Sequence, residues 1–274
     1  MVSSILVIGA GELGNAVLRS LASHPARSNT KISLLMRPAS ITVNDETKKQ
    51  VLANLEALDI GVVAGDVLED SNEELAQIFR AYHTVIGCSG MAMPAGSQVK
   101  IAKAVLASGC QRYFPWQFGI DYDILGQDSA QDLFTEQLDV RGMLRAQSEL
   151  EWVIVSTGIF TSFIFEPSFG IVNAERTAVM ALGSWENHVT ATAPEDIGKV
   201  VAEIALSKPD VKGVIFEAGD TVSMRQIADI VDRVLEKKVD RSVKTVEQLK
   251  QKLAADPNNG MTKYRVVFAE GKGI

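Results

Sequence analysis

Three glycines near the N-terminus have the spacing of a phosphate-binding turn. Gly9, Gly11 and Gly14 form G-x-G-x-x-G directly after an apolar run at residues 5–8 and before a helical pattern. The first glycine permits a tight turn, the second lets the backbone approach a pyrophosphate, and the third lets helix and strand pack closely. The first helical turn, with Glu12 and Leu13, then presents N–H groups to the phosphates. We therefore predict that this turn binds a dinucleotide; a purely structural glycine turn is the alternative.

Arg37 stands where a dinucleotide-binding fold selects its cofactor. It ends the second predicted strand, residues 31–36, and residues 31–40 contain no acid. An NAD-binding unit usually carries Asp or Glu there for the ribose 2′-OH, whereas Arg accommodates a 2′-phosphate. Arg37, helped by Lys48 or Lys49 in the next predicted helix, favours NADP(H), with a solvated basic residue as the alternative.

The elements that position these residues alternate between strand and helix patterns. Expected strands are residues 5–8, 31–36, 60–64, 84–87, 111–116 and 152–156, and helices follow the first five, including residues 45–58, 97–108 and 131–148. This rhythm predicts parallel βαβ units. We expect an α/β, Rossmann-type doubly wound parallel sheet, with a NAD(P)-binding domain at 1–155 and a smaller C-terminal substrate-binding lobe at 156–274, whose strands and helices return to the Rossmann core.

Composition excludes several classes of function. The 274 residues are 46% hydrophobic with a net charge of −7, so we expect a globular protein that does not bind nucleic acid. The two cysteines, Cys88 and Cys110, lack metal-site spacing, so neither a disulfide framework nor a metal is expected. No stretch has the length of a membrane span or the pattern of a signal peptide, which favours the cytoplasm.

A family likeness becomes visible at residues 111–121, Gln-Arg-Tyr-Phe-Pro-Trp-Gln-Phe-Gly-Ile-Asp. With the glycine turn, Arg37 and the motifs at 65–66, 139–141 and 194–198, the chain resembles the NmrA-like and isoflavone-reductase-like group of atypical short-chain dehydrogenases as far as about residue 220. The resemblance implies NADPH as cofactor and, in the reductase branch, hydride transfer to secondary metabolites. By position it implies further cofactor contacts at Ser89, Gly90, Pro115 and Arg141.

The chain departs from this family at the positions that move protons. The family's lysine in K-x-x-x-R is Gln137 here, and the glutamate of its Pro-Ser-Glu-Phe-Gly stretch is Gln117. Glutamine cannot exchange a proton at neutral pH. Tyr-x-x-x-Lys is absent from the sequence as well. We expect proton delivery from water or from Asp121, Tyr122 or His188; an exposed loop histidine is the alternative for His188. Gln137 interrupts an apolar helix face, so it is either hydrogen-bonded in the core or faces the acceptor in a cleft.

Aromatic residues predict the substrate side. Trp116 and Gln117 lie in the family stretch, and Phe160 and Phe163 open an apolar passage that forms either core packing or a pocket wall for a flat ligand. The leading hypothesis is an NADPH-dependent reductase of a small aromatic or conjugated metabolite, reducing a C=C, C=N or benzylic bond. The alternatives are a redox-neutral, cyclase-type enzyme and an NADP-sensing regulator. A homodimer is the oligomeric state to test.

Overall fold

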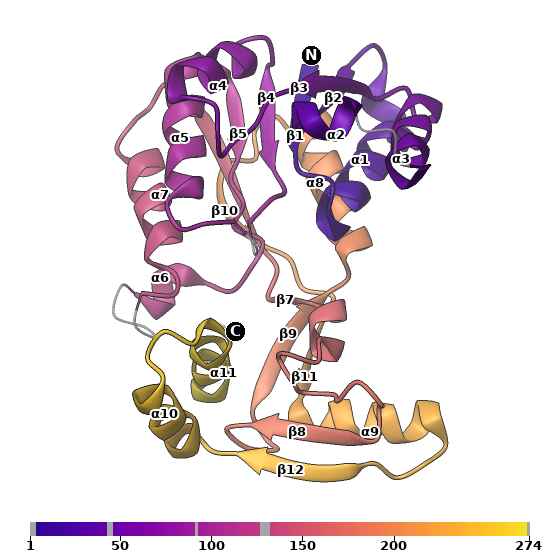
Figure 1. The fold of residues 1–274 in the computed structure, drawn as a ribbon, viewed down its shortest axis with the longest axis vertical. Coiled ribbons are helices and arrows are strands. Elements are labelled where there is room, and N and C mark those ends of the chain that lie inside the picture. Colours follow the sequence, from indigo (N-terminus) through magenta and orange to yellow (C-terminus); the bar gives the residue numbers. More distant parts are fainter. Residues whose placement is uncertain (1–3, 43–45, 91–92, 127–131, 273–274) are drawn as a thin grey trace. The chain divides into compact units, whose positions relative to one another are not determined.

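The computed structural model describes residues 4–42, 46–90, 93–126 and 132–272 (Figure 1), apart from the side chains of residues 42, 47 and 48. Contacts between residues divide the chain into two compact units. The first contains Met1–Gln117, Asp139–Val155 and Pro194–Ile215, and the second contains Phe118–Leu138, Ser156–Ala193 and Phe216–Ile274. The units are interleaved in sequence, because residues 118–138 belong to the second unit and residues 194–215 return to the first. The expected division at residue 155 remains a prediction.

A seven-stranded sheet forms the centre of the first unit. Its order is β10-β6-β5-β4-β1-β2-β3. The strands are β1 (Ser4–Ile8), β2 (Lys31–Met36), β3 (Gly61–Ala64), β4 (Thr84–Gly87), β5 (Arg112–Phe114), β6 (Glu151–Ser156) and β10 (Gly213–Phe216). The neighbouring strands from β3 to β6 pair in parallel, and Ile8 of β1 is level with Leu35 of β2 and Gly87 of β4. The chain order reverses between β1 and β4, which is where such sheets bind ligands. The predicted Rossmann-type fold is confirmed.

Helices cover both faces of this sheet (Figure 1). They are α1 (Glu12–Ser23), α2 (Pro38–Thr42), α3 (Glu46–Ala57), α4 (Asn72–Phe79), α5 (Ser97–Ser108) and α8 (Pro194–Ser207), with a short 3₁₀ turn, η1 (Pro25–Arg27). All five residues of β1 are buried, as expected of a strand covered on both faces. Helix α1 packs against α8 at Gly198, where a Cβ would lie 2.7 Å from the backbone of Ala16. Glycine at this position therefore permits the close helix crossing.

The second unit combines two small sheets with helices. One sheet has the order β11-β9-β7, and the other pairs β8 with β12 in parallel. Its elements are α6 (Tyr122–Leu125), β7 (Ile159–Phe160), η2 (Thr161–Phe165), β8 (Ala178–Leu182), β9 (His188–Thr192), β11 (Asp220–Ser223), α9 (Met224–Leu235), β12 (Asp240–Lys244), α10 (Val246–Ala255) and α11 (Gly260–Glu270). Aromatic rings occupy its core: Phe169 stacks on Phe163 at 4.6 Å and meets Phe268 edge-on at 5.3 Å.

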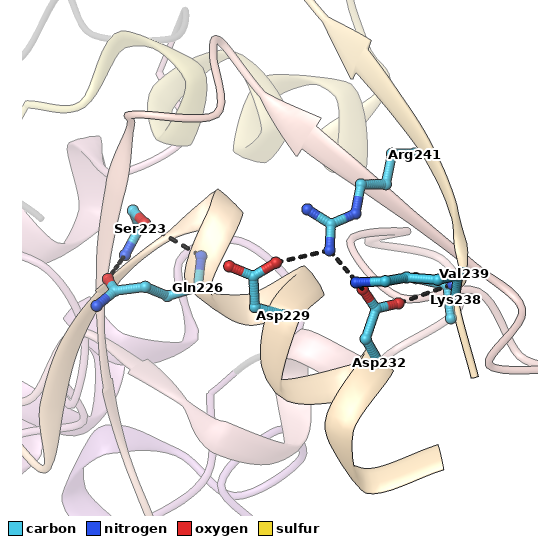
Figure 2. Close-up of polar contacts among 7 residues, drawn as sticks. All are labelled: Ser223, Gln226, Asp229, Asp232, Lys238, Val239 and Arg241. Carbon is cyan, nitrogen blue, oxygen red and sulfur yellow. Dashed lines mark hydrogen bonds and ion pairs between the residues drawn. The ribbon is translucent and has the colours of Figure 1, made fainter. Parts of the chain in front are cut away.

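Asp232 of α9 ties that helix to β12 (Figure 2). Its carboxylate accepts hydrogen bonds from the Val239 N–H at 2.7 Å, from Lys238 Nζ at 3.0 Å and from Arg241 Nη2 at 2.6 Å. Arg241 also donates to Asp229 at 2.7 Å. The backbone hydrogen bond from Val239, followed by that from Lys238, lowers the pKa of Asp232 to about 2. The carboxylate is therefore held in its charged form by the fold.

Two expected elements are shorter in the structure. The helix expected at 131–148 is α7 (Thr135–Arg145), which has residues in both units. Asp132 has a φ of +80°, which is incompatible with a helix, and Gln147 accepts from the Leu150 N–H at 2.8 Å and so closes the C-terminal end. The strand expected at 111–116 ends at Phe114, because Pro115 has no N–H to donate to the ladder.

Candidate functional site

The three glycines of the N-terminal turn differ in the space around their Cβ positions and in their backbone conformation. Gly9 has a φ of +99°, and a Cβ there would lie 1.9 Å from Ser89 Oγ. A Cβ on Gly14 would lie 2.0 Å from the Gly9 carbonyl oxygen, so α1 could not approach β1 as closely. Gly11 has an ordinary φ of −73°, and nothing lies within 4 Å of its Cβ position. The fold therefore requires glycine at 9 and 14, whereas the space at Gly11 is open for a ligand.

The start of α1 is suited to anion binding. Gly11 is the N-cap and supplies no side-chain acceptor to the first turn. Asn15 Nδ2 donates to the Ala10 carbonyl at 2.8 Å and so fixes the turn. Glu12 is exposed, while the Leu13 side chain is buried in the core. Leu13 can therefore offer a ligand only its backbone, which is what phosphate binding at a helix N-terminus uses.

A pocket of about 390 Å³ in the first unit brings three of the predicted cofactor residues together. Its lining includes Gly9, Arg37 and Ser89, with Ser40 and Asp66. Arg37 is exposed, and its guanidinium forms no ion pair with any residue within the described ranges. Asp66 Oδ1 accepts from the Leu68 N–H at 3.0 Å and so shapes the turn after β3. The pocket thus offers a cation, a hydroxyl and the backbone of Gly9 and Ala10, which fit a phosphorylated dinucleotide.

Ser40 and Gln98 are residues of this site that the sequence interpretation missed. Ser40 lines the pocket three residues after Arg37. Gln98 is buried at the start of α5, and its Nε2 donates to the Ser89 carbonyl at 2.8 Å. Gln98 thereby fixes the loop after β4, but no local motif marks it. Lys48 lies in α3, and its side chain is outside the described residues.

The loops after β4 and β5 meet at Gly90. A Cβ on Gly90 would lie 1.8 Å from Cδ2 of Trp116, so the indole lies directly on the glycine. Gly87 is similarly close to this segment, since its Cβ position lies 3.1 Å from the backbone nitrogen of Trp116. Pro115 and Cys88 are buried beside them, and burial raises the pKa of the Cys88 thiol. Cys88 is therefore a small core residue, not a nucleophile.

Gln117 and Arg141 fix one another inside the first unit. Each is 1% exposed, and Arg141 Nε donates to Gln117 Oε1 at 2.7 Å. The amide oxygen accepts from the guanidinium where the resembling family carries a carboxylate. The predicted contacts of Gln117 with substrate and of Arg141 with cofactor stay predictions, and so does that of Pro115.

Arg112 lies in the stretch 111–121 that resembles the family, but its role in the structure is to stabilise the fold. It is 2% exposed, and its guanidinium donates to the carbonyls of Ile204 and Lys208, each at 3.1 Å, and to that of Val211. These carbonyls lie at the end of α8 and in the following turn, so Arg112 caps that helix from β5. Burial lowers the pKa of the guanidinium.

The proton-donor candidates Asp121 and Tyr122 lie in the second unit, near the start of α6. Asp121 is the N-cap, and its Oδ1 accepts from the Asp123 N–H at 3.0 Å. Tyr122 is 4% exposed, and its ring lies 4.8 Å from that of Phe134. Both side chains therefore have a part in the fold of this unit, and their catalytic roles remain predictions.

Gln137, His188 and the two phenylalanines also belong to the second unit. Gln137 is buried on α7, whereas His188 is exposed at the start of β9. Phe163 packs against the core, and Phe160 is half-buried in β7. The dinucleotide pocket is lined by residues of the first unit, and the catalytic and substrate roles of these four residues stay predictions.

Two negative findings apply to the described ranges. They contain no group of three His, Cys, Asp or Glu side chains suited to hold a metal ion. They also contain no helix with the length and hydropathy needed to cross a membrane.

Comparison with known proteins identifies the family. The profile of the NmrA-like family matches residues 1–273. An NmrA-like family domain-containing oxidoreductase of Gibberella moniliformis is 47% identical over 276 residues, covering 100% of this chain and 90% of that protein. Phenylcoumaran benzylic ether reductase Pyrc5 of Pyrus communis is 25% identical, covering 98% of this chain and 87% of the reductase.

A solved structure shares the fold. The binary complex of leucoanthocyanidin reductase with NADPH from Vitis vinifera has a TM-score of 0.79 at 16% identity, covering 99% of this chain and 89% of that one. The resemblance inferred from the motifs is confirmed, since the family profile spans almost the whole sequence: the chain belongs to the NmrA-like family.

Proposed function

We propose that the protein is an NADPH-dependent reductase that acts on a small aromatic or conjugated metabolite. The observation that carries the proposal is the pocket in which Gly9, Ser89 and Arg37 meet beside the open backbone at Gly11. The relatives of the chain support the reaction class, since they include an oxidoreductase and a benzylic ether reductase. The proposed substrate carries a C=C, C=N or benzylic C–O bond as the hydride acceptor.

The chain's own residues would hold the cofactor by its phosphates. The N–H groups at the start of α1 would bind the pyrophosphate across Gly11, and the Arg37 guanidinium would pair with the 2′-phosphate, with Ser40 in the same pocket. Ser89, fixed by Gln98, lies against Gly9 and closes the crevice between β1 and β4. When bound, NADPH would supply a hydride, and reduction of an uncharged acceptor requires one further proton.

That proton has to come from a group other than the residue at position 137. Gln137 holds an amide that neither donates nor accepts a proton at neutral pH, although it can hydrogen-bond a carbonyl oxygen. We propose that Gln137 orients the acceptor and that water, or Asp121, Tyr122 or His188, delivers the proton. An already polarised acceptor, such as an iminium ion or enone, needs little acid assistance.

A labelled cofactor tests this proposal. We expect stereospecific deuterium transfer from one of the two C4-labelled forms of NADPH into a conjugated carbonyl probe. Gln137→Lys should raise the rate on such probes because it adds a titratable amine, and Gln137→Met is the uncharged control of similar size. Loss of the label to solvent, or no deuterium in any product, would count against the reductase.

Gln137 also favours a second candidate, a protein that binds NADP(H) without consuming it. Both a redox-neutral, cyclase-type enzyme and an NADP-sensing regulator need the cofactor pocket but no proton donor at this position. Product formation that continues without NADPH would identify the former. Tight NADPH binding without turnover, together with a protein partner whose affinity changes with the cofactor, would identify the latter.

A further inference from the structure

The indole of Trp116 lies with its face on Gly90. The Cβ position of Gly90 is 1.8 Å from Cδ2, and 2.1 Å from both Cε2 and Cε3. Cδ2 is a ring-fusion carbon bonded to both other atoms, so a point this close to all three lies above the ring and not at its edge. One face of the indole is thus backed by the glycine backbone, while the side chain as a whole is only half-buried.

The position of the Trp116 ring along the sheet indicates which end of the cofactor it would face. Arg37 follows β2, on one side of β1, whereas Gly90 and Trp116 follow β4 and β5 on the other side. A dinucleotide at the reversal of strand order extends across the carboxyl ends of strands on both sides. A dinucleotide whose 2′-phosphate pairs with Arg37 would extend with its second nucleotide toward β4 and β5. Trp116, which follows β5, would then lie on the nicotinamide side.

We propose that Trp116 is a specificity-determining platform on which a planar aromatic substrate stacks beside the nicotinamide. The inference rests on the proposed function and narrows its substrate class. Gly90 backs the ring, so the indole is pre-positioned and a flat ligand stacks on it without reordering the side chain. An aliphatic acceptor gains nothing from this surface. Trp116 binds and orients the substrate and moves no proton.

Cofactor binding supplies the first test. Energy transfer from tryptophan to bound NADPH is measured in the wild type and in Trp116→Phe, with Trp152→Phe as the control, because Trp152 lies near the amino end of β6 in the same unit. Trp116→Phe should lose most of the sensitised NADPH emission at saturation, whereas Trp152→Phe keeps most of it. Equal losses in the two variants would overturn the inference. A wild-type protein that binds no NADPH would instead refute the proposed reductase itself.

A matched pair of probes supplies the second test. Cinnamaldehyde and crotonaldehyde carry the same enal, with and without a phenyl ring, and their binding to the NADP⁺-saturated protein is measured by calorimetry. The measured quantity is the ratio of the crotonaldehyde Kd to the cinnamaldehyde Kd. Stacking should make this ratio roughly two- to tenfold larger in the wild type than in Trp116→Ala. Gly90→Ala, which displaces the indole, should reduce the preference as well, while Gly142→Ala, with nothing within 4 Å of its Cβ position, should not. An unchanged ratio in Trp116→Ala, or no preference in the wild type, would overturn the inference.

Discussion

Replacement of Gly11 by alanine should separate cofactor binding from folding. Nothing lies within 4 Å of the Gly11 Cβ position, and its φ of −73° suits any residue. Alanine is a poorer N-cap than glycine, which lowers stability. Alanine also lowers the conformational entropy of the unfolded chain, which stabilises the folded protein by about 0.4–1 kcal/mol. These effects oppose each other, so the free energy of unfolding should change by less than about 1 kcal/mol.

The same methyl group should strongly weaken cofactor binding. It occupies the open space where a pyrophosphate approaches the backbone, so at least one hydrogen bond to a charged oxygen is lost. Such a bond contributes about 1.5–3 kcal/mol, which corresponds to a roughly 10- to 150-fold rise in Kd. NADPH fluorescence titration measures the Kd, and urea unfolding of the same sample measures stability.

Gly14→Ala is the matched control. Its Cβ would lie 2.0 Å from the Gly9 carbonyl oxygen, so the backbone must shift, and we expect a loss of about 1–3 kcal/mol of stability or more. If Gly11→Ala binds NADPH as tightly as the wild type, the space beside Gly11 is not the phosphate site. If it loses stability as Gly14→Ala does, the reasoning about open space is wrong.

Three further predictions concern single residues. Arg37→Ala should weaken NADPH binding by about 1–3 kcal/mol and leave NADH binding almost unchanged, as titration with both cofactors would show; equal losses for both would contradict the 2′-phosphate assignment. Gly198→Ala should destabilise the protein, because overpacking against Ala16 costs about 1–3 kcal/mol, more than the helix-propensity gain of about 1 kcal/mol. Gly142 on α7 is exposed, so Gly142→Ala should stabilise the protein. Urea unfolding measures both, and midpoints that move in the same direction would refute the packing argument. The fold lowers the pKa of Asp232, so the stabilising contribution of its carboxylate is complete above about pH 4 and is lost as the pH falls toward 2. Asp232→Asn should therefore flatten the decline of the free energy of unfolding between these pH values, as measured by urea unfolding. An unchanged slope in the variant would contradict this role of Asp232.

Local features of the site and fold could be predicted from the sequence because their chemistry lies within a few residues. The turn from Gly9 to Gly14 is one example. The capping boxes that begin α4 and α9 are others, since Ser71 and Glu74 exchange hydrogen bonds, and so do Ser223 and Gln226 (Figure 2).

Features that depend on distant partners could not be predicted. Strands β8 and β12 are short and pair across about sixty residues of sequence, with little alternation to mark them. Arg112 binds carbonyls more than ninety residues away, so a residue that suggested a family motif has a capping role that only the fold reveals. The contact of Trp116 with Gly90 likewise follows from the alignment of β4 and β5, not from either loop alone.

The most direct test of the account is a crystal structure with bound NADPH. It predicts a pyrophosphate over the open backbone at Gly11 and a 2′-phosphate within hydrogen-bonding distance of the Arg37 guanidinium. A dinucleotide bound elsewhere, or bound in this pocket with its 2′-phosphate away from Arg37, would contradict it.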